Sequence, residues 1–286
     1  MYFSLVILSI YPSIMKHSIL FCVFLYVFSA TVFAQYRTKS NISYYEGDAK
    51  HDARVYERCK LDVYYPEGKQ GYATIIWFHG GGLTGGNKEL PEALKNQGVA
   101  VVSVGYRLSP AASVDGIIED AAAAIAWVKR HIAEYGGSER LIFVSGHSAG
   151  GYLGMMTVLD KSYLQKYGID ADGIAGLIPF SGQAITHFTR RKELGIEETQ
   201  PTVDRLSPLF HVRKEAPSIV LITGDRELEM LGRYEENAYL ARMLKIVGHA
   251  DVQLLELQGY GHDMQFPAFP LLLKEVKSRA EKNSRP

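Results

Sequence analysis

The sequence predicts an α/β protein with a mostly parallel central sheet and helices on both of its faces. Short apolar, β-branched runs alternate with longer helix-like runs along most of the chain. Several of the short runs are apolar without interruption, as in parallel strands that are buried on both faces. The 286 residues, 47% hydrophobic and 22% charged, have the composition of an ordinary globular protein.

The N-terminal segment, residues 1–34, has the pattern of a secretory signal peptide. The basic residues Lys16 and His17 follow Met15 and precede an apolar core over residues 19–28. Small residues then end the segment at Ala34, as at a signal-peptidase cleavage site. Met15 is a plausible true start of translation. The alternative is an uncleaved membrane anchor, but the apolar core is short for a membrane span. We expect cleavage after Ala34 and export to the periplasm or the medium.

Residues 35–286 are expected to form a single domain with no stable membrane span. They contain no repeat, low-complexity tract or long linker, and Cys59 alone cannot form an internal disulfide. The formal net charge is zero and no block of lysine and arginine stands out. The sequence therefore gives no support to a nucleic-acid partner or an anionic membrane surface.

The expected strands are short apolar runs between turn-forming residues. Residues 60–67 alternate apolar and polar side chains, as does a strand with one exposed face. Residues 73–80 and 99–107 are continuous apolar runs, which are typical of buried parallel strands. The remaining strands are expected at residues 140–146, 173–182, 216–225 and 251–259.

The expected helices are longer runs with helix-like composition. Residues 90–98 and 114–136 each end at a glycine, which commonly terminates a helix. Residues 232–248 carry apolar side chains at helical spacing, and further helices are expected at 149–160 and 267–280. In such folds, functional residues gather in the loops beyond the carboxyl ends of the strands. We therefore expect the functional residues of this chain in those loops.

The segment GHSAG (146–150) matches the pattern G-x-S-x-G where an expected strand turns into an expected helix. Such a turn forces an unusual backbone conformation on the serine, and side chains at the flanking positions would clash. The helix N-terminus also favours negative charge. The alternative is a serine in an ordinary glycine-rich loop, but this position favours Ser148 as a nucleophile.

The segment HGGG (79–82) directly follows an expected buried strand. Consecutive glycines allow backbone N–H groups to approach the oxyanion of an acyl-transfer transition state without obstruction by side chains. The alternative is a flexible glycine loop with no catalytic role. The presence of this loop upstream of Ser148 favours the catalytic interpretation.

A serine nucleophile requires a histidine base and a carboxylate that fixes the tautomer of that histidine. Among the histidines that follow Ser148, His262 directly follows an expected strand at the correct edge of the sheet. Asp225, Glu227 and Glu229 follow the preceding strand. Their positions alone do not choose among the three carboxylates.

Together these motifs resemble the α/β-hydrolase superfamily, in which nucleophile, acid and base follow one another in this order. More narrowly, the chain resembles the carboxylesterase and lipase group related to hormone-sensitive lipase and to bacterial feruloyl and acetyl esterases. The resemblance runs from about Lys60 to the C-terminus. It rests on the segments FHGGG (78–82), VSVGYRLSP (102–110), EDAAAAIAWVKRH (119–131), GHSAGG (146–151), LITGDRE (221–227) and GYGH (259–262).

The resemblance implies roles for particular residues. The backbone N–H groups of Gly81, Gly82 and Ala149 are implied as the oxyanion hole. The acid in this group usually lies three residues after the glycine that ends the strand, a position held here by Glu227, with Asp225 as the alternative. Glutamate there departs from the more frequent aspartate.

The longest irregular stretch, residues 183–215, follows an expected strand. It is expected to overhang the site as a lid or pocket wall, with His187 and Phe188 against the substrate. The alternative is a solvated excursion at the surface.

The sequence thus predicts a serine hydrolase of short acyl esters that acts through an acyl-enzyme without a metal or an organic cofactor. Its expected partner is a small-molecule or carbohydrate ester. Acetyl or feruloyl groups on carbohydrates are suggested only by the resemblance and the expected export. An amidase, formamidase or peptidase with the same triad is the main alternative, and a non-catalytic binding protein on the same scaffold is a remote one.

Overall fold

The computed structural model describes residues 35–45, 53–230 and 232–283. The predicted signal peptide, residues 1–34, lies outside the described residues. Residues Gln35–Pro286 fall in one structural unit. Within the described ranges, none of the helices combines the length and the apolar character needed to cross a membrane.

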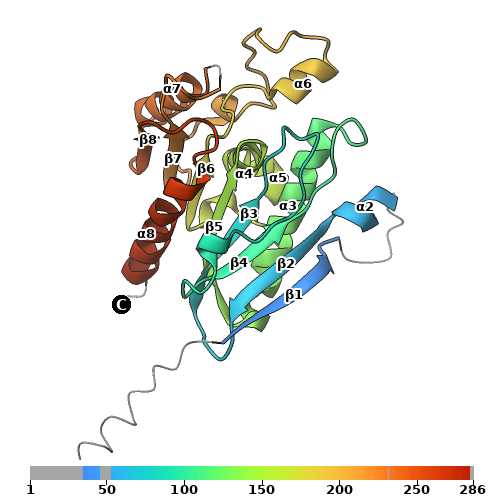
Figure 1. Cartoon of the computed structure of the whole chain (residues 1–286), viewed down its shortest axis with the longest axis vertical. Helices are drawn as coiled ribbons and strands as arrows, with labels where there is room; N and C mark the ends of the chain where they lie inside the picture. Colours follow the sequence, from blue (N-terminus) through green and yellow to red (C-terminus); the bar gives the residue numbers. More distant parts are fainter. Residues whose placement is uncertain (1–34, 46–52, 231, 284–286) are drawn as a thin grey trace, which may run out of the picture. The chain divides into compact units, whose positions relative to one another are not determined.

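The described part of the chain is built around an eight-stranded sheet with the strand order β1-β2-β4-β3-β5-β6-β7-β8 (Figure 1). The pairs β1–β2 and β2–β4 are antiparallel, and the other neighbouring strands pair in parallel. The predicted mostly parallel sheet is therefore confirmed. The strands are β1 (Tyr36–Ser43), β2 (Lys60–Pro66), β3 (Tyr72–Phe78), β4 (Ala100–Val104), β5 (Gly137–His147), β6 (Gly176–Phe180), β7 (Ile219–Gly224) and β8 (Val252–Leu257).

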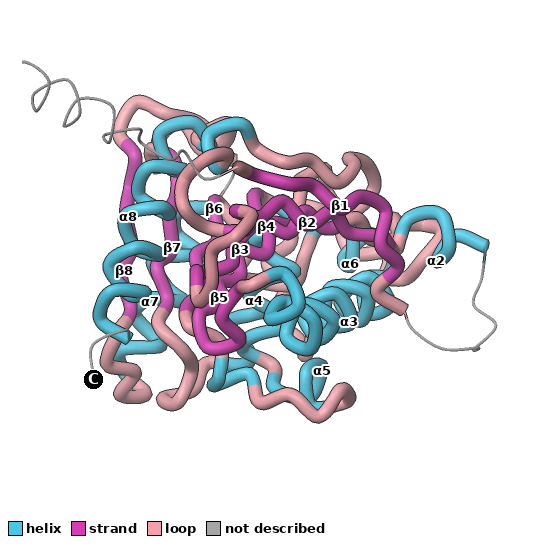
Figure 2. Tube along the Cα trace, turned by 90° about the horizontal axis from the view of Figure 1, so that it is seen from below, coloured by secondary structure: helices cyan, strands magenta, loops and turns pink. Residues whose placement is uncertain are grey.

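Helices cover both faces of this sheet. The α-helices are α2 (Ala53–Arg58), α3 (Val114–His131), α4 (Ala149–Leu159), α5 (Lys161–Gln165), α6 (Phe188–Glu193), α7 (Arg233–Ile246) and α8 (Gln265–Asn283). Figure 2 shows α3 and α5 together on one side of strands β1 to β4.

Alternate side chains of one strand enter two separate hydrophobic cores. Ile76 and Phe78 of β3 pack in the core that contains α3, α4 and α7 side chains. Ile75 and Trp77 of the same strand pack in the second core, with side chains of α8. Because successive residues of a strand point to opposite faces, a strand covered on both sides is apolar throughout. This is why residues 73–80 form an uninterrupted apolar run.

Two elements differ from the sequence-based predictions. The prediction of a helix over residues 90–98 is wrong, because this segment forms only a short 3-10 helix at Glu92–Leu94. Asn96 and Gly98 both have positive φ angles, which a continuous right-handed helix does not accommodate. Strand β1 was not expected, because this edge strand is mostly exposed and polar and lacks an apolar pattern.

Candidate active site

Ser148 lies on a sharp turn between β5 and α4. Its backbone has φ 54° and ψ −115°, a conformation that non-glycine residues rarely adopt. The turn is fixed because the N–H of Ser148 donates to the carbonyl of Phe180 at the end of β6, at 2.8 Å. The serine is only 7% exposed, and it directly precedes the first residue of α4. The strand–turn–helix setting that the sequence predicts for this motif is therefore present.

The glycines that flank Ser148 are required by close packing against β3. A Cβ atom added to Gly146 would lie 2.6 Å from the carbonyl oxygen of Phe78. A Cβ atom on Gly150 would lie 2.0 Å from the same oxygen. Any side chain at either position would collide with backbone, so the two glycines allow the elbow to sit directly against the end of β3.

His262 lies in the loop between β8 and α8, and its ring reaches Ser148. The distance from His262 Nε2 to Ser148 Oγ is 2.9 Å, although the residues are 114 positions apart in the sequence. At this distance the imidazole can accept the hydroxyl proton. The structure thus brings together the two residues that the sequence analysis selected as nucleophile and base.

The carboxylate that contacts His262 is Glu229, between β7 and α7. Glu229 Oε2 lies 2.9 Å from His262 Nδ1. The carboxylate is also held by the backbone N–H groups of Gly224, at 3.1 Å, and Met230, at 3.0 Å, and by the hydroxyl of Ser181. Its side chain is only 1% exposed.

The expected pairing of Glu227, or alternatively Asp225, with His262 is wrong. Glu227 is exposed. Asp225 instead stabilises the loop, because it accepts N–H groups from Glu227 at 3.0 Å and Gly259 at 2.8 Å. The N–H of Glu229 donates to the Asp225 carbonyl at 2.8 Å. This additional turn places the acid two positions later than the spacing implied by the resemblance.

The contacts of Glu229 keep its carboxylate charged. Burial by itself raises the pKa of this group. The hydrogen bonds from His262 and Ser181, together with the charge on His262, outweigh burial and lower the pKa to about 2. An ionised carboxylate on Nδ1 fixes the histidine tautomer in which Nε2 can accept a proton from Ser148.

His147 supports the loop that carries His262, a role that the sequence analysis missed. Its Nε2 lies 2.8 Å from the His262 carbonyl, and its Nδ1 lies 3.1 Å from Gln265 Nε2. Burial, followed by the charge on His262, lowers the pKa of His147 to about 4, so the ring is neutral near pH 7. The Gln265 amide nitrogen donates to Nδ1, and Nε2–H therefore donates to the His262 carbonyl. Position 147 is the variable position of the motif and carried no signal for this role.

The glycine loop after β3 lies beside the serine. A Cβ atom on Gly80 would lie 3.6 Å from the Cβ atom of Ser148. Gly81 and Gly82 have φ angles of 111° and 61°, and a Cβ atom on Gly81 would lie 2.3 Å from the carbonyl oxygen of Gly85. Only glycine fits this tightly folded loop without strain.

Hydrogen bonds to carbonyl groups set the direction of the loop N–H groups. The Gly81 carbonyl accepts N–H groups from Thr84, at 3.1 Å, and Gly85, at 2.9 Å. His79 Nδ1 lies 2.7 Å from the Gly80 carbonyl. The C=O and N–H of a trans peptide point in opposite directions. The bond to the Gly80 carbonyl therefore turns the Gly81 N–H outward, away from His79, and the bonds to the Gly81 carbonyl turn the Gly82 N–H outward, away from Thr84 and Gly85. The N–H of Ala149, in the first turn of α4, has no acceptor within its own helix.

The two insertion residues expected at the substrate occupy different environments. His187 is 1% exposed, its Nδ1 accepts the N–H of Thr189 at 3.2 Å, and its ring centroid lies 4.9 Å from that of Tyr152. It caps α6 from the interior and leaves little surface for a substrate, contrary to expectation. Phe188 is partly buried, and its ring lies 3.0 Å from the position of a Cβ atom on Gly82. Phe188 therefore lines the glycine loop.

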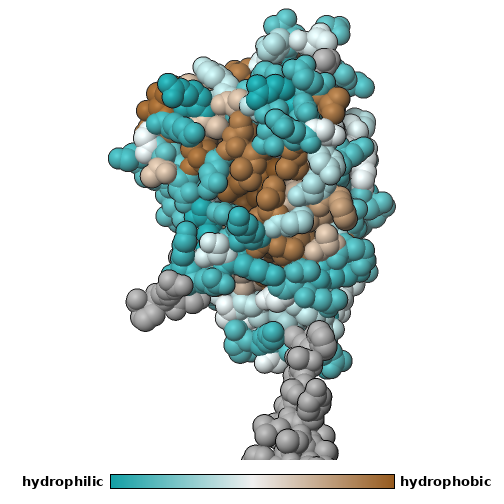
Figure 3. Space-filling model, turned by 60° about the vertical axis from the view of Figure 1, so that its left-hand side comes forward, coloured by the Kyte–Doolittle hydropathy of each residue, from teal (hydrophilic) through white to brown (hydrophobic). Residues whose placement is uncertain are grey.

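Exposed apolar residues flank the acid and the base along the chain. Leu228 and Met230 flank Glu229, and Tyr260 and Phe266 lie on either side of His262. Phe266, at 83%, is the most exposed of the large hydrophobic residues described. Figure 3 shows one face of the molecule on which hydrophobic side chains gather in a hollow within a hydrophilic surround.

Other candidates for chemistry are structural. Cys59 is fully buried, and burial raises the pKa of its thiol to about 12, which suppresses the reactive thiolate. In the ranges that the structure describes, no three histidine, cysteine, aspartate or glutamate side chains are grouped to hold a metal ion.

The parallel strands, the serine elbow, and the acid and histidine loops after β7 and β8 define the α/β-hydrolase class. The chain belongs to the BD-FAE family, whose model matches residues 61–230. The resemblance to α/β-hydrolase esterases is therefore confirmed.

Two curated relatives are named for ester hydrolysis. The chain is 28% identical over 218 residues to "Probable carboxylic ester hydrolase LipM" of Mycobacterium tuberculosis, a match that covers 68% of this chain and 49% of LipM. It is 29% identical over 253 residues to "Probable isoprenylcysteine alpha-carbonyl methylesterase ICMEL1" of Oryza sativa, covering 77% and 59%. The chain thus spans about half to three-fifths of the length of these relatives.

A solved structure described as a "Truncated form of carbohydrate esterase from gut microbiota" shares the fold. It aligns with a TM-score of 0.70 and 19% sequence identity. The alignment covers 88% of this chain and 99% of that one. At this identity the similarity shows the fold alone.

Proposed function

We propose that this protein is a serine hydrolase of carboxylic esters. One observation carries the proposal: Ser148, His262 and Glu229 form a continuous hydrogen-bonded chain with both links at 2.9 Å. The names of the curated relatives, which describe ester hydrolases, support the same reaction.

In the first step, Ser148 Oγ attacks the acyl carbon while His262 Nε2 takes the hydroxyl proton. Glu229 holds Nδ1–H and stabilises the imidazolium that forms. The developing oxyanion is bound by the outward N–H groups of Gly81 and Gly82 and by that of Ala149. Loss of one such donor typically costs about 3 to 4 kcal/mol of transition-state stabilisation.

Collapse of the tetrahedral intermediate breaks the ester bond, and His262 gives its proton to the leaving alcohol. A water molecule then attacks the acyl-enzyme while His262 accepts one of its protons. The second intermediate releases the carboxylic acid and returns the proton to Ser148 Oγ.

The proposed substrates are short acyl esters, including acetyl or feruloyl groups on carbohydrates. One solved structure with the same fold is described as a carbohydrate esterase, which supports this class. Phe188, beside Gly82, is proposed to form part of the wall that contacts the substrate. Export after removal of residues 1–34 belongs to the same proposal.

The test compares Ser148→Ala with wild-type protein on p-nitrophenyl acetate. Loss of the nucleophile is expected to lower kcat by about 10⁴-fold or more. Ser138→Ala, at the opposite end of β5, is the matched control and should hydrolyse the ester at nearly the wild-type rate. Near-normal activity of Ser148→Ala contradicts the proposal. Acetyl, butyryl and feruloyl esters, acetylated xylan and the matching anilides then define the substrate class.

A further inference from the structure

The insertion at residues 183–215 is bonded directly to the oxyanion loop. The hydroxyl of Thr189, in the first turn of α6, donates to the Gly82 carbonyl at 2.5 Å. Thr189 is only 3% exposed, and the ring of its neighbour Phe188 packs against Gly82. The two bonded residues are 107 positions apart in the sequence, so this contact depends on the tertiary fold.

This bond reaches the part of the loop that the loop does not fix by itself. The Gly81 carbonyl is held inside the loop by the N–H groups of Thr84 and Gly85. The Gly82 carbonyl is instead held from outside, by Thr189. Glycine has the widest backbone freedom of any residue, so the conformation of Gly82 depends on contacts that restrain both of its adjoining peptides. The bonds to the Gly81 carbonyl restrain the peptide that carries the Gly82 N–H, and Thr189 restrains the peptide that follows Gly82.

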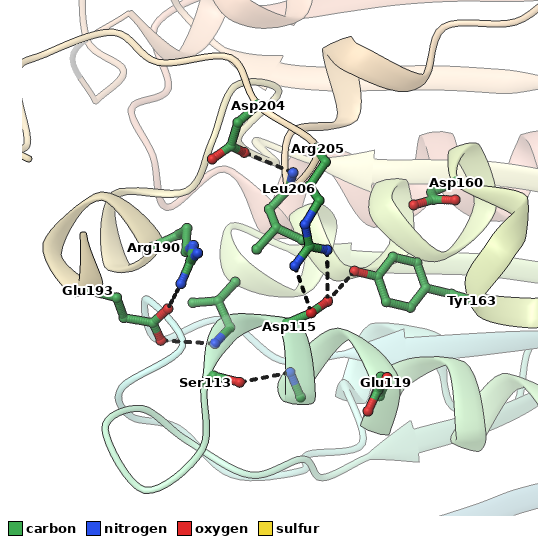
Figure 4. Close-up of polar contacts among 12 residues, drawn as sticks. Ser113, Asp115, Glu119, Asp160, Tyr163, Arg190, Glu193, Asp204, Arg205 and Leu206 are labelled. Atoms are coloured by element: carbon green, nitrogen blue, oxygen red, sulfur yellow. Dashed lines mark hydrogen bonds and ion pairs between the residues drawn. The ribbon is translucent and has the colours of Figure 1, made fainter.

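The insertion that carries α6 is itself fastened to the start of α3 (Figure 4). Glu193, at the end of α6, accepts the backbone N–H of Val114 at the start of α3, at 2.9 Å. Arg205 pairs with Asp115 at 3.0 Å, and Asp115 also accepts the hydroxyl of Tyr163 in α5 at 2.5 Å. Two points of the insertion, Glu193 and Arg205, are thus tied to the N-terminus of α3, and α6 is a fixed support for Thr189.

We propose that Thr189 is a positioning residue for ester hydrolysis, which fixes the peptide after Gly82 and so limits rotation of the Gly82 backbone, keeping its N–H in place to bind the oxyanion. The insertion then acts as a rigid part of the catalytic apparatus. This inference rests on the proposed function, because it gives Thr189 a role in stabilising the transition state of that reaction.

The experiment compares Thr189→Val, which removes the hydroxyl at nearly constant volume, with Thr189→Ser, which retains it. Thr189→Val is expected to lower kcat on p-nitrophenyl acetate by about tenfold or more with little change in KM, because the loss falls on the transition state. Thr189→Ser should remain within about threefold of wild type. Affinity for a trifluoromethyl ketone, which forms a tetrahedral adduct with Ser148, should fall in parallel with kcat/KM.

Thr186→Val is the matched control for loss of a buried hydroxyl in the same insertion. Thr186 is fully buried, and its hydroxyl donates to Asp204 at 2.9 Å, within the insertion itself rather than toward the glycine loop. This variant should lower the melting temperature while kcat stays within about twofold. Thr189→Ala repeats the test if Thr189→Val folds poorly.

The outcomes separate this inference from the proposed function. Unchanged kcat in a folded Thr189→Val or Thr189→Ala overturns the positioning role while Ser148-dependent hydrolysis stands. An equal loss in Thr189→Ser also overturns it, because the hydroxyl is then not the cause. If wild-type hydrolysis does not depend on Ser148, the proposed function fails and this inference fails with it.

Discussion

At the scale of single residues, the acid shows where sequence reasoning reached its limit. Three carboxylates follow β7 within five positions, and all of them lie at the correct edge of the sheet. The choice depends on the turn in which the N–H of Glu229 bonds to the Asp225 carbonyl, which directs Glu229 inward and leaves Glu227 exposed. Spacing relative to a motif does not encode that turn.

Glu229→Gln is expected to lower kcat by about 10³- to 10⁴-fold, because an amide cannot stabilise the imidazolium or enforce the required tautomer. Glu227→Gln is the matched control, and its kcat should stay within about twofold of wild type because this side chain is exposed. Steady-state kinetics on p-nitrophenyl acetate measure both. A larger loss of kcat in Glu227→Gln than in Glu229→Gln would contradict Glu229 as the acid and support Glu227 instead.

At the scale of elements, the sequence predicts best where burial dictates composition. β3 and β4 are buried along their whole length and largely apolar because helices cover both of their faces. The exposed edge strand β1 and the broken segment 90–98 escaped prediction, because their conformation depends on pairing and local φ angles rather than on an apolar pattern. The elbow was predictable because its glycines have a steric reason.

Gly150→Ala tests that steric reason. The added methyl group would lie 2.0 Å from the Phe78 carbonyl oxygen, so we expect a loss of about 3 kcal/mol or more in the free energy of unfolding. In Gly173→Ala the nearest atom is the Lys129 ammonium nitrogen at 3.9 Å, and the change should stay within about 0.5 kcal/mol. Urea denaturation compares the two variants, and equal effects would contradict the close packing of the elbow on β3.

At the scale of the whole molecule, the parallel sheet assembles the site. The glycine loop, Ser148, Ser181, Glu229 and His262 follow β3, β5, β6, β7 and β8 in turn, so all lie at the carboxyl edge. This rule allowed the sequence analysis to select His262. It could not reveal His147 or Thr189, because their roles arise from contacts between loops rather than from position at the edge.

The stability of the whole molecule should fall as the pH drops from about 6.5 to 4. Burial lowers the pKa of both His79 and His147 to about 4, so the unfolded chain binds protons at these residues before the folded protein does. Urea unfolding at several pH values between 7 and 4 measures the slope. His147→Gln should reduce the proton uptake on unfolding by about one in this range. An unchanged slope would contradict a buried neutral His147.

The most direct test of the central claim is covalent labelling of Ser148 with diethyl p-nitrophenyl phosphate, followed by intact and peptide mass spectrometry. The account predicts one phosphoryl group per chain, located on Ser148, with ester hydrolysis lost in proportion to labelling. Ser148→Ala should remain unlabelled under the same conditions. Full hydrolytic activity in completely labelled protein, or labelling at a different residue that accounts for the lost activity, would contradict the assignment of Ser148 as the nucleophile.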